Sequence, residues 1–314
     1  MNLVYIIIGL VLLIFGGNWL LKSAVGLSLR LQIPKIVIGM TVVSFATSAP
    51  ELIVSLKSAL QGHSDLALGN VIGSNIANLG LVLGITVLLS TIKIDKSFFT
   101  TDWPIMILSS ALLYFFIASD GVLEAYEGFI LFVLLLMFLV YLLKFQKTAV
   151  LDEIPGDDKE LPLWNAIMYL SIGGISLWAG SELLIKGAVA LAMQFDVSER
   201  IIGVTIISVG TSIPELSASI VAVINKEKAI SLGNLIGSNM FNILAVLGLT
   251  SMVSPIEVKD MGLINNDIYW MLFVSVVIVP LSLLSFKKTG AQLGRLQGVI
   301  LLSFYIVFVY QMIS

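Results

Sequence analysis

The chain of 314 residues contains no cysteine and only one histidine, His63. Without cysteine there are no disulfide bonds, thiol nucleophiles or cysteine-ligated metals, and one histidine cannot build the usual kind of zinc site. His63 stands in a polar turn at the end of a predicted span, which leaves no ordinary Ser-His pair for an intramembrane enzyme. We therefore expect neither an enzyme nor a resident cofactor.

Charged residues are also scarce, at 12% of the chain against 58% hydrophobic residues. A soluble domain carries roughly 25% charged residues. Apolar stretches long enough to cross a hydrocarbon layer of ~30 Å recur along the sequence. Runs such as Gly128–Leu143 lack the period-two alternation of barrel strands. The composition predicts an all-α integral membrane protein in a lipid bilayer, and nothing in it predicts a nucleic-acid or protein partner.

The apolar stretches predict ten spans in two groups of five, separated by one longer polar linker. The spans are expected near residues 3–29, 35–60, 66–90, 103–119, 125–143, 164–193, 200–223, 230–252, 268–285 and 295–312. The first lacks a basic flank and a cleavage site, so we interpret it as a retained span. The predicted organisation is a single membrane domain with a first repeat at 1–143, a cytoplasmic linker at 144–163 and a second repeat at 164–314.

Lysine and arginine gather in the loops that follow the odd-numbered spans, whereas the opposite face carries only Lys57, Lys186, Arg200 and Lys259. The positive-inside rule then places the odd loops and the linker in the cytoplasm. We expect a multi-pass protein of the cell membrane with both termini extracytoplasmic.

The two halves of the chain repeat each other at a constant offset of 164 residues, without a gap. The matched residues include Glu51 with Glu215, Pro50 with Pro214, Thr47-Ser48 with Thr211-Ser212, Lys22 with Lys186, Gly69-Asn70 with Gly233-Asn234, Gly73-Ser74-Asn75 with Gly237-Ser238-Asn239, and Asn78 with Asn242. Because each repeat holds an odd number of spans, the second must cross the membrane in the opposite sense. Inverted repeats are common in secondary transporters, whose site lies at the repeat interface.

Two polar segments, Thr47–Glu51 and Thr211–Glu215, interrupt otherwise apolar spans. An ionised carboxylate at mid-span costs several kcal/mol unless it is paired or binds an ion, and the simplest partner for two carboxylates is a divalent cation. The prolines remove helical partners from the carbonyls of Ser44–Thr47 and Ser208–Thr211. A hard, all-oxygen site of this kind suits Ca²⁺ and Na⁺.

A second polar constellation surrounds Ser74 and Asn78, which share a helix face, and it recurs at Ser238 and Asn242. From the residues alone, helix–helix hydrogen bonding and ion coordination are both open roles for these four side chains. Gly69 and Gly73 have the spacing of a small-residue face and are predicted to pack against a neighbouring helix.

These motifs resemble the sodium/calcium exchanger family of the cation/calcium antiporter superfamily, whose two α-repeats match Gly39–Gly84 and Gly203–Gly248. The chain is especially similar to prokaryotic members, which lack the large cytoplasmic loop of animal exchangers. The resemblance implies ten transmembrane helices arranged as two inverted five-helix repeats. It also implies antiport of one Ca²⁺ against several Na⁺, usually three, by alternating access.

The resemblance also implies roles for individual residues. Glu51 and Glu215 would ligate Ca²⁺ with the carbonyls of Thr47 and Thr211. The central position would be lined by Asn78 and Asn242. One flanking sodium site would consist of Ser48, Ser238, Glu51 and the Ser44 carbonyl. The other would consist of Ser212, Ser74, Glu215 and the Ser208 carbonyl.

The sequence departs from the family pattern at Ala46, where the first motif usually has glycine, while Gly210 keeps it in the second. Potassium-dependent relatives carry aspartate at the position of Asn242, so the amide argues against potassium dependence. A proton/calcium antiporter on the same fold, with H⁺ as a partner, stays open because the glutamates can titrate. A cation channel is disfavoured by the inverted repeat and the mid-membrane carboxylates, since channel selectivity is more often built by rings across subunits.

Overall fold

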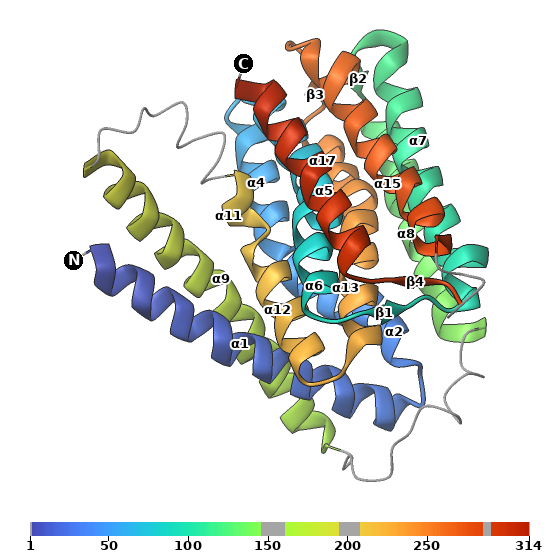
Figure 1. Cartoon of the computed structure of the whole chain (residues 1–314). Coiled ribbons are helices and arrows are strands. Elements are labelled where there is room, and N and C mark those ends of the chain that lie inside the picture. The colour runs from blue at the N-terminus through green and yellow to red at the C-terminus, as the bar shows by residue number, and fades with distance from the viewer. Residues whose placement is uncertain (1, 146–160, 195–207, 285–289, 314) are drawn as a thin grey trace. The chain divides into compact units, whose positions relative to one another are not determined.

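The computed structural model describes residues 2–145, 161–194, 208–284 and 290–313 (Figure 1). The chain divides into two compact units. Unit 1 comprises Met1–Thr47, Val140–Leu235 and Val309–Ser314, and unit 2 comprises Ser48–Leu139 and Ile236–Phe308. Each unit therefore draws on both halves of the sequence. Most of the predicted linker, 146–160, lies outside the described residues.

Eight helices within the described residues are long and apolar enough to cross a membrane. They are Val4–Leu31, Ser64–Leu89, Phe98–Asp120, Ala125–Lys144, Leu163–Gly187, Lys228–Val253, Leu263–Leu283 and Arg295–Met312. Lys35–Thr47 and Ala49–Leu60 qualify together as one broken span. The predicted seventh span is described only from Ser208, because 200–207 lie outside the described residues. An all-helical membrane architecture is thus confirmed, and the count of ten spans stays a prediction.

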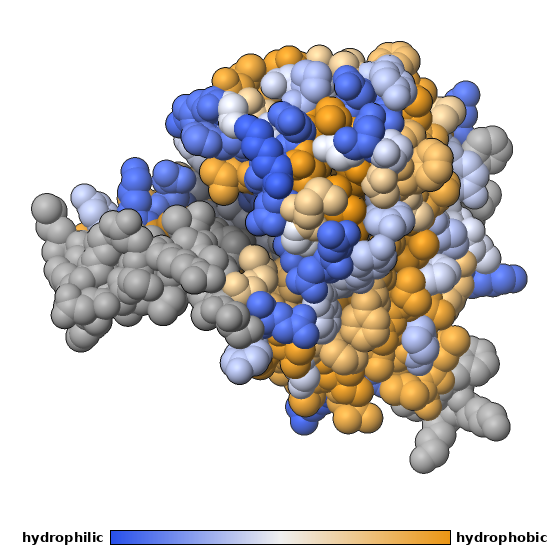
Figure 2. Space-filling view, turned by 90° about the horizontal axis from the view of Figure 1, so that it is seen from above, coloured by the Kyte–Doolittle hydropathy of each residue, from blue (hydrophilic) through white to orange (hydrophobic). Residues whose placement is uncertain are grey.

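Exposed apolar side chains cover the flanks of these helices. Phe115, Ile224 and Ile306 are among the large hydrophobic residues with most of their surface exposed. Figure 2 shows hydrophilic residues (blue) gathered over the helix ends that it views, with hydrophobic residues (orange) on the flanks. An aqueous protein would lose stability by exposing so much apolar surface, whereas a bilayer solvates it.

Unit 1 is built around two long helices, α1 and α9, against which the broken helices pack. Its elements are α1 (Asn2–Leu31), α2 (Lys35–Ile38), η1 (Gly39–Val43), α3 (Ser44–Thr47), α9 (Leu163–Gln194), α11 (Ser208–Thr211), α12 (Ile213–Ile224) and the first part of α13 (Lys228–Phe241). The buried core joins Leu13 and Leu20 of α1 to Leu177 of α9 and Val221 of α12.

The crossing of α1 and α9 is made by four glycines. A Cβ placed at Gly9 would lie 2.8 Å from the Gly180 carbonyl oxygen, and one placed at Gly16 would lie 3.0 Å from the Gly173 carbonyl oxygen. Gly9 and Gly173 are repeat equivalents, as are Gly16 and Gly180, so the contact is symmetric. Small residues allow the backbones to approach closely, which is how helices associate where lipid surrounds them.

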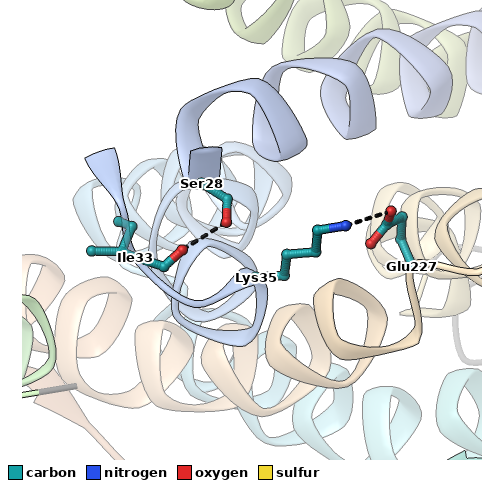
Figure 3. A network of polar contacts seen from close by, with 4 residues as sticks. All are labelled: Ser28, Ile33, Lys35 and Glu227. Atoms are coloured by element: carbon teal, nitrogen blue, oxygen red, sulfur yellow. Dashed lines mark hydrogen bonds and ion pairs between the residues drawn. The ribbon is translucent and has the colours of Figure 1, made fainter. Parts of the chain in front are cut away.

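Unit 1 also contains a polar junction at the start of the first broken helix (Figure 3). The Ser28 hydroxyl donates to the Ile33 carbonyl at 2.6 Å across the turn between α1 and α2. The Lys35 ammonium, at the start of α2, pairs with the Glu227 carboxylate between α12 and α13 at 2.8 Å. Both side chains are largely buried, so the pair ties α2 to the α12–α13 turn.

Unit 2 contains the remaining helices. They are α4 (Ala49–Leu60), α5 (Ser64–Ala77), η2 (Asn78–Val82), α6 (Leu83–Leu89), η3 (Phe98–Asp102), α7 (Trp103–Asp120), α8 (Ala125–Phe145, of which the part to Leu139 belongs here), the end of α13, η6 (Asn242–Leu247), α14 (Gly248–Val253), η7 (Leu263–Asp267), α15 (Ile268–Leu283) and α17 (Arg295–Ile313, to Phe308).

Two small antiparallel sheets in unit 2 were not predicted. β1 (Ile92–Lys93) pairs with β4 (Gln292–Leu293), and β2 (Val122–Leu123) pairs with β3 (Ile256–Glu257). Gly121, at φ 78°, ends α7, and its carbonyl accepts a hydrogen bond from the Val258 N–H at 2.8 Å. Each sheet joins a strand from the first half of the sequence to one from the second. Two-residue strands are too short to leave an alternating pattern.

π-Helical turns interrupt the spans in the described part of the chain. η3 and η7 lead directly into α7 and α15. These helices therefore begin at Phe98 and Leu263, five residues earlier than the spans predicted from hydropathy. η2 and η6 begin at the candidate site residues Asn78 and Asn242. Such turns occur frequently at functional sites.

The predicted packing of Gly73 against a neighbouring helix is not found among the described residues. A Cβ placed at Gly73 would meet none of their atoms within 4 Å, whereas one at Gly69 would make ordinary contact with Leu263 Cδ2 at 3.6 Å. The close approach occurs instead at Gly39, where a Cβ would lie 2.5 Å from the Ile230 carbonyl oxygen. The reciprocal contact, from Gly233 of α13 to the Ile36 carbonyl of α2, completes a backbone-to-backbone contact between α2–η1 and α13.

Candidate functional site

Two serines break the helices that carry the candidate glutamates. Ser48 separates α3 from α4 at φ −87° and ψ 3°, and Ser212 separates α11 from α12 at φ −89° and ψ 4°. A proline follows each break within the first two residues of the new helix. Proline lacks an N–H and clashes with the carbonyl four residues back, so the helix restarts at this point.

The restart places each glutamate in the first turn of a half-helix. Glu51 lies there in α4 and Glu215 in α12, and both are 0% exposed. The N-terminal end of a helix carries a partial positive charge that favours an anion. This partial charge supports an ionised carboxylate, but it does not replace the full countercharge that a buried carboxylate needs.

In unit 1, an asparagine connects the two broken helices. The Thr47 hydroxyl donates to Asn234 Oδ1 at 3.1 Å, and Asn234 Nδ2 donates to the Ser219 hydroxyl of α12 at 3.4 Å. The Ser44 hydroxyl lies 2.8 Å from the Gly39 carbonyl oxygen and 2.9 Å from the Asn234 carbonyl oxygen. Asn234 therefore orients the end of α3, whose Thr47 carbonyl is a predicted ligand.

In unit 2, the equivalent asparagine holds the other half-helix. Asn70 Nδ2 donates to the Ser55 hydroxyl of α4 at 3.0 Å and lies 3.5 Å from the Glu51 carbonyl oxygen. The Ser55 hydroxyl in turn donates to the Ala67 carbonyl at 3.3 Å. These bonds attach the first turns of α4 to α5, and so fix the backbone that carries Glu51.

Four buried asparagines of unit 2 form a closed, symmetric network. Asn75 Nδ2 donates to the Asn239 carbonyl and Asn239 Nδ2 to the Asn75 carbonyl, both at 3.2 Å. Asn78 Nδ2 donates to Asn239 Oδ1 at 3.1 Å, and Asn242 Nδ2 donates to Asn75 Oδ1 at 3.0 Å. The two outer amides are thereby held with their nitrogens engaged.

The oxygens of these outer amides have no donor in the described part of the chain. Asn78 Oδ1 and Asn242 Oδ1 are buried and accept no hydrogen bond from the described residues, and the Ser212 hydroxyl is in the same condition. A buried polar atom without a partner costs about 1–3 kcal/mol. Neutral amide and hydroxyl oxygens are ligands that Ca²⁺ and Na⁺ accept. The donor chemistry therefore fits a hard cation.

The described residues contain no group of three or more His, Asp or Glu side chains that could hold a metal ion.

The structure places the predicted residues in both units. Ser44, Thr47, Thr211, Ser212 and Glu215 belong to unit 1, and Ser48, Glu51, Ser74, Asn78, Ser238 and Asn242 belong to unit 2. The backbone of Ser208 lies in α11 of unit 1, while its side chain lies outside the described residues. Within unit 2, the network brings Asn78 and Asn242 together through their two asparagine neighbours.

The sequence analysis assigns no role to six residues of these networks. They are Ser55, Asn70, Asn75, Ser219, Asn234 and Asn239. The four asparagines stand among its repeat-matched residues, whereas Ser55 and Ser219 are not singled out, although they too are polar residues in apolar spans that recur at the repeat offset.

Comparisons with known proteins agree over nearly the whole chain. A family described as "Sodium/calcium exchanger protein" matches residues 1–144 and 165–314. CaxA of Alkalimonas amylolytica is 37% identical, covering 99% of this chain and 98% of the relative. Sodium/calcium exchanger MaX1 of Methanosarcina acetivorans is 30% identical, covering 98% of this chain and 97% of the relative.

A solved structure of a sodium-calcium exchanger is also similar over nearly the whole chain. The sodium-calcium exchanger NCX_Mj, soaked with Na⁺ and Ca²⁺, matches with a TM-score of 0.81 and 27% identity, covering 99% of this chain and 98% of that one. Both broken helices fall inside the residues that the family matches.

Proposed function

The chain belongs to the sodium/calcium exchanger protein family, and from this premise we propose that it is a secondary active antiporter that exchanges Ca²⁺ for Na⁺ by alternating access. One observation carries the proposal. Glu51 and Glu215 are fully buried carboxylates, each in the first turn of a half-helix inside an apolar span. Burial at that depth is tolerated when a cation compensates the charge.

Charge explains why the two ions would compete. One Ca²⁺ or several Na⁺ ions offset the negative charge of the two carboxylates, and a site whose carboxylates are offset passes an apolar barrier more readily than an empty, doubly charged site. A protein that changes access only when bound cations offset its carboxylates exchanges one ion for the other and does not leak. This requirement separates an antiporter from a channel.

We assign the ligands as follows. Glu51 and Glu215 bind Ca²⁺ with the carbonyls of Thr47 and Thr211. Asn78 and Asn242 line the central position. The two flanking sodium sites use the hydroxyls of Ser48, Ser238, Ser212 and Ser74 with the carbonyls of Ser44 and Ser208. The buried Asn78 Oδ1, Asn242 Oδ1 and Ser212 hydroxyl, which have no donor among the described residues, support this assignment.

The neutral oxygens favour sodium as the coupling ion. Serine hydroxyls suit a monovalent cation better than a second divalent one. Replacing Ser74 or Ser212 by alanine would then weaken sodium dependence more than calcium binding. We propose three Na⁺ per Ca²⁺, which moves one net positive charge per cycle, so exchange should respond to an imposed membrane potential.

For the mechanism, we propose that α1 and α9 move together. The glycine crossing joins these two helices closely, so they would move as one. The motion would take place relative to α12, which contacts α1 where the Ser217 hydroxyl donates to the Leu13 carbonyl at 2.8 Å. A thiol cross-linker between cysteines at Leu13 and Ser217 should stop exchange. The control links α1 to α9 through Lys22 and Tyr169, which lie in contact, and should leave exchange intact. Undiminished exchange with the first link would contradict this motion.

The orientation follows from the distribution of basic residues. We propose that the protein lies in the cell membrane with both termini extracytoplasmic and that the two five-span repeats, 1–143 and 164–314, form one membrane domain. A cysteine introduced near either terminus should react with an impermeant thiol reagent in intact cells. The cysteine-free background makes this labelling specific.

The decisive experiment measures calcium flux in proteoliposomes under separately imposed gradients. Calcium uptake should follow an outward sodium gradient and should not respond to a potassium or proton gradient alone. Uptake driven by protons without sodium would establish the proton/calcium antiporter instead. Uptake without any counter-ion would indicate a channel.

A further inference from the structure

Two cavities of unit 1 adjoin each other beside α1. One, of about 690 Å³, is bordered by apolar side chains of α1 and α12, including Leu10, Ile14 and Ile220. The other, of about 710 Å³, is bordered by Trp19, Lys22 and Glu227. Asn18 and Asn225 border both cavities, so the two are neighbours, and we treat them as an apolar part and a polar part of one groove. We call it the α1–α12 groove.

Apolar side chains beside the apolar part are exposed. Ile14 on one side and Ile224 on the other are 55% and 70% exposed. Three polar side chains border this part, Asn18, Ser217 and Asn225, and each already donates to a backbone carbonyl at 2.8 Å. The rest of the wall is hydrocarbon. In a membrane-spanning segment the surrounding medium is acyl chains, which are the apolar material at hand to fill it.

The polar part carries the positive charge of Lys22. The Lys22 ammonium lies 3.2 Å from the Tyr169 hydroxyl and 4.5 Å from the centre of the same ring. It forms no ion pair with any described residue. Glu227, the carboxylate that borders this cavity, is engaged by Lys35 at 2.8 Å. Lys22 therefore has donors to offer to an anion, and Trp19 and Tyr169 beside it are typical of the membrane interface.

We propose that the α1–α12 groove binds one glycerophospholipid, with an acyl chain between α1 and α12 and its phosphate at Lys22. A basic pocket between spans that opens onto an apolar groove matches both ends of such a molecule. A free phosphate would use only the polar part, and a lipid without a phosphate only the apolar part. The site is separate from the proposed ion ligands, and its test does not depend on ion exchange.

The repeat supplies a matched control. Lys186 is the equivalent of Lys22, but it lies 3.9 Å from Glu182 within its own helix, and both side chains are exposed. Lys186 borders neither cavity. Among the described residues, the same residue type at the equivalent position thus lies beside a carboxylate and outside the groove, so the proposal predicts one lipid per chain.

The test is native mass spectrometry of the purified, delipidated full-length chain titrated with phosphatidylglycerol. We expect one lipid to bind ahead of all others. Lys22→Gln should weaken its binding about fivefold, because one lysine near the lipid phosphates contributes about that much. Lys186→Gln should leave it unchanged. Ile220→Trp, which fills the apolar part, should weaken binding, whereas the repeat-equivalent Leu56→Trp should not.

Several results would overturn the proposal. Lys22→Gln could bind the lipid as tightly as the unaltered chain, or Lys186→Gln could lose as much affinity as Lys22→Gln. Diacylglycerol binding as tightly as phosphatidylglycerol would remove the role of the phosphate. Inorganic phosphate displacing the lipid at equal concentration would assign the polar part to a free anion. The thermal midpoint of each variant confirms that it is folded.

Discussion

The two broken helices have the same backbone conformation at the break, but they carry different residues two positions before it. Ser48 and Ser212 have nearly the same backbone angles, and each precedes a 12-residue helix with a glutamate in its first turn. Ala46 stands before the first break and Gly210 before the second. The repeat is therefore kept in the backbone angles at the break and in the glutamates, and it is relaxed at the residue two positions before the break.

The difference between Ala46 and Gly210 corresponds to the residues of α9 that they face. Ala46 faces Gly174, where an added Cβ would lie 3.7 Å from the Ala46 Cβ. Gly210 faces Ile185, whose Cδ1 would lie 2.5 Å from an added Cβ. Ala46 thus packs against a glycine of α9, and Gly210 packs against an isoleucine of α9. The larger side chain lies on the broken helix in the first case and on α9 in the second, so each pair keeps one small residue at the contact.

The largest effect should come from the residues that the two halves share. Glu51→Gln or Glu215→Gln should each lower calcium exchange in proteoliposomes by more than about a hundredfold, because removing one charge from a buried ionic contact costs about 3–5 kcal/mol. Without bound ions, the thermal midpoint of either variant should be no lower than that of the unaltered chain, because a buried charge has been removed. Near-normal exchange by either purified variant would reject the assignment.

The symmetric glycine crossing provides the next test. Gly173→Ala should destabilise the protein by about 1–3 kcal/mol, because the new Cβ would lie 2.8 Å from the Leu20 backbone nitrogen. Its neighbour Gly174 is the control, since Gly174→Ala meets only the Ala46 Cβ, in ordinary contact, and alanine favours a helix. Thermal melting in detergent distinguishes the two variants. Equal midpoints would show that the crossing tolerates a methyl group.

The asparagine network should respond equally from both halves. Asn75→Ala and Asn239→Ala each remove two of its hydrogen bonds and release one outer amide, Asn242 or Asn78 respectively. At about 1 kcal/mol for each of the two bonds, calcium affinity should fall about thirtyfold in either variant. Calorimetric titration with Ca²⁺ measures this loss. A loss of that size in one variant with none in the other would contradict a symmetric role.

The exchange of volume at α9 should give the smallest effect. Gly210→Ala should cost about 1 kcal/mol, and adding Ile185→Ala should recover part of it by removing the atoms that the new methyl meets. Ala46→Gly should cost less than about 1 kcal/mol, which is the helix propensity difference. Melting of the single and double variants forms a double-mutant cycle. Strict additivity would mean that the two sites do not interact.

The sequence predicts the helical membrane architecture, the breaks before Pro50 and Pro214 and the burial of both glutamates, because each depends on a strong local signal. It does not predict the two-residue strands, since β1 to β4 are set by partners distant in the sequence. The π-turns at Asn78 and Asn242 are equally hidden, because one extra residue per turn leaves the apolar pattern intact. Spacing also does not say which glycine another helix approaches, and the close backbone contacts are made at Gly39 and Gly233.

The most direct test of the proposed function is the number of calcium ions bound per chain. If Glu51 and Glu215 serve one ion, calorimetry should find one Ca²⁺ on the unaltered chain and none, at the same concentrations, on Glu51→Gln or Glu215→Gln. The double variant should then lose no more calcium binding than either single variant. Two ions on the unaltered chain with one left on each single variant would show two independent sites, and it would contradict an exchanger built around a shared pair of carboxylates.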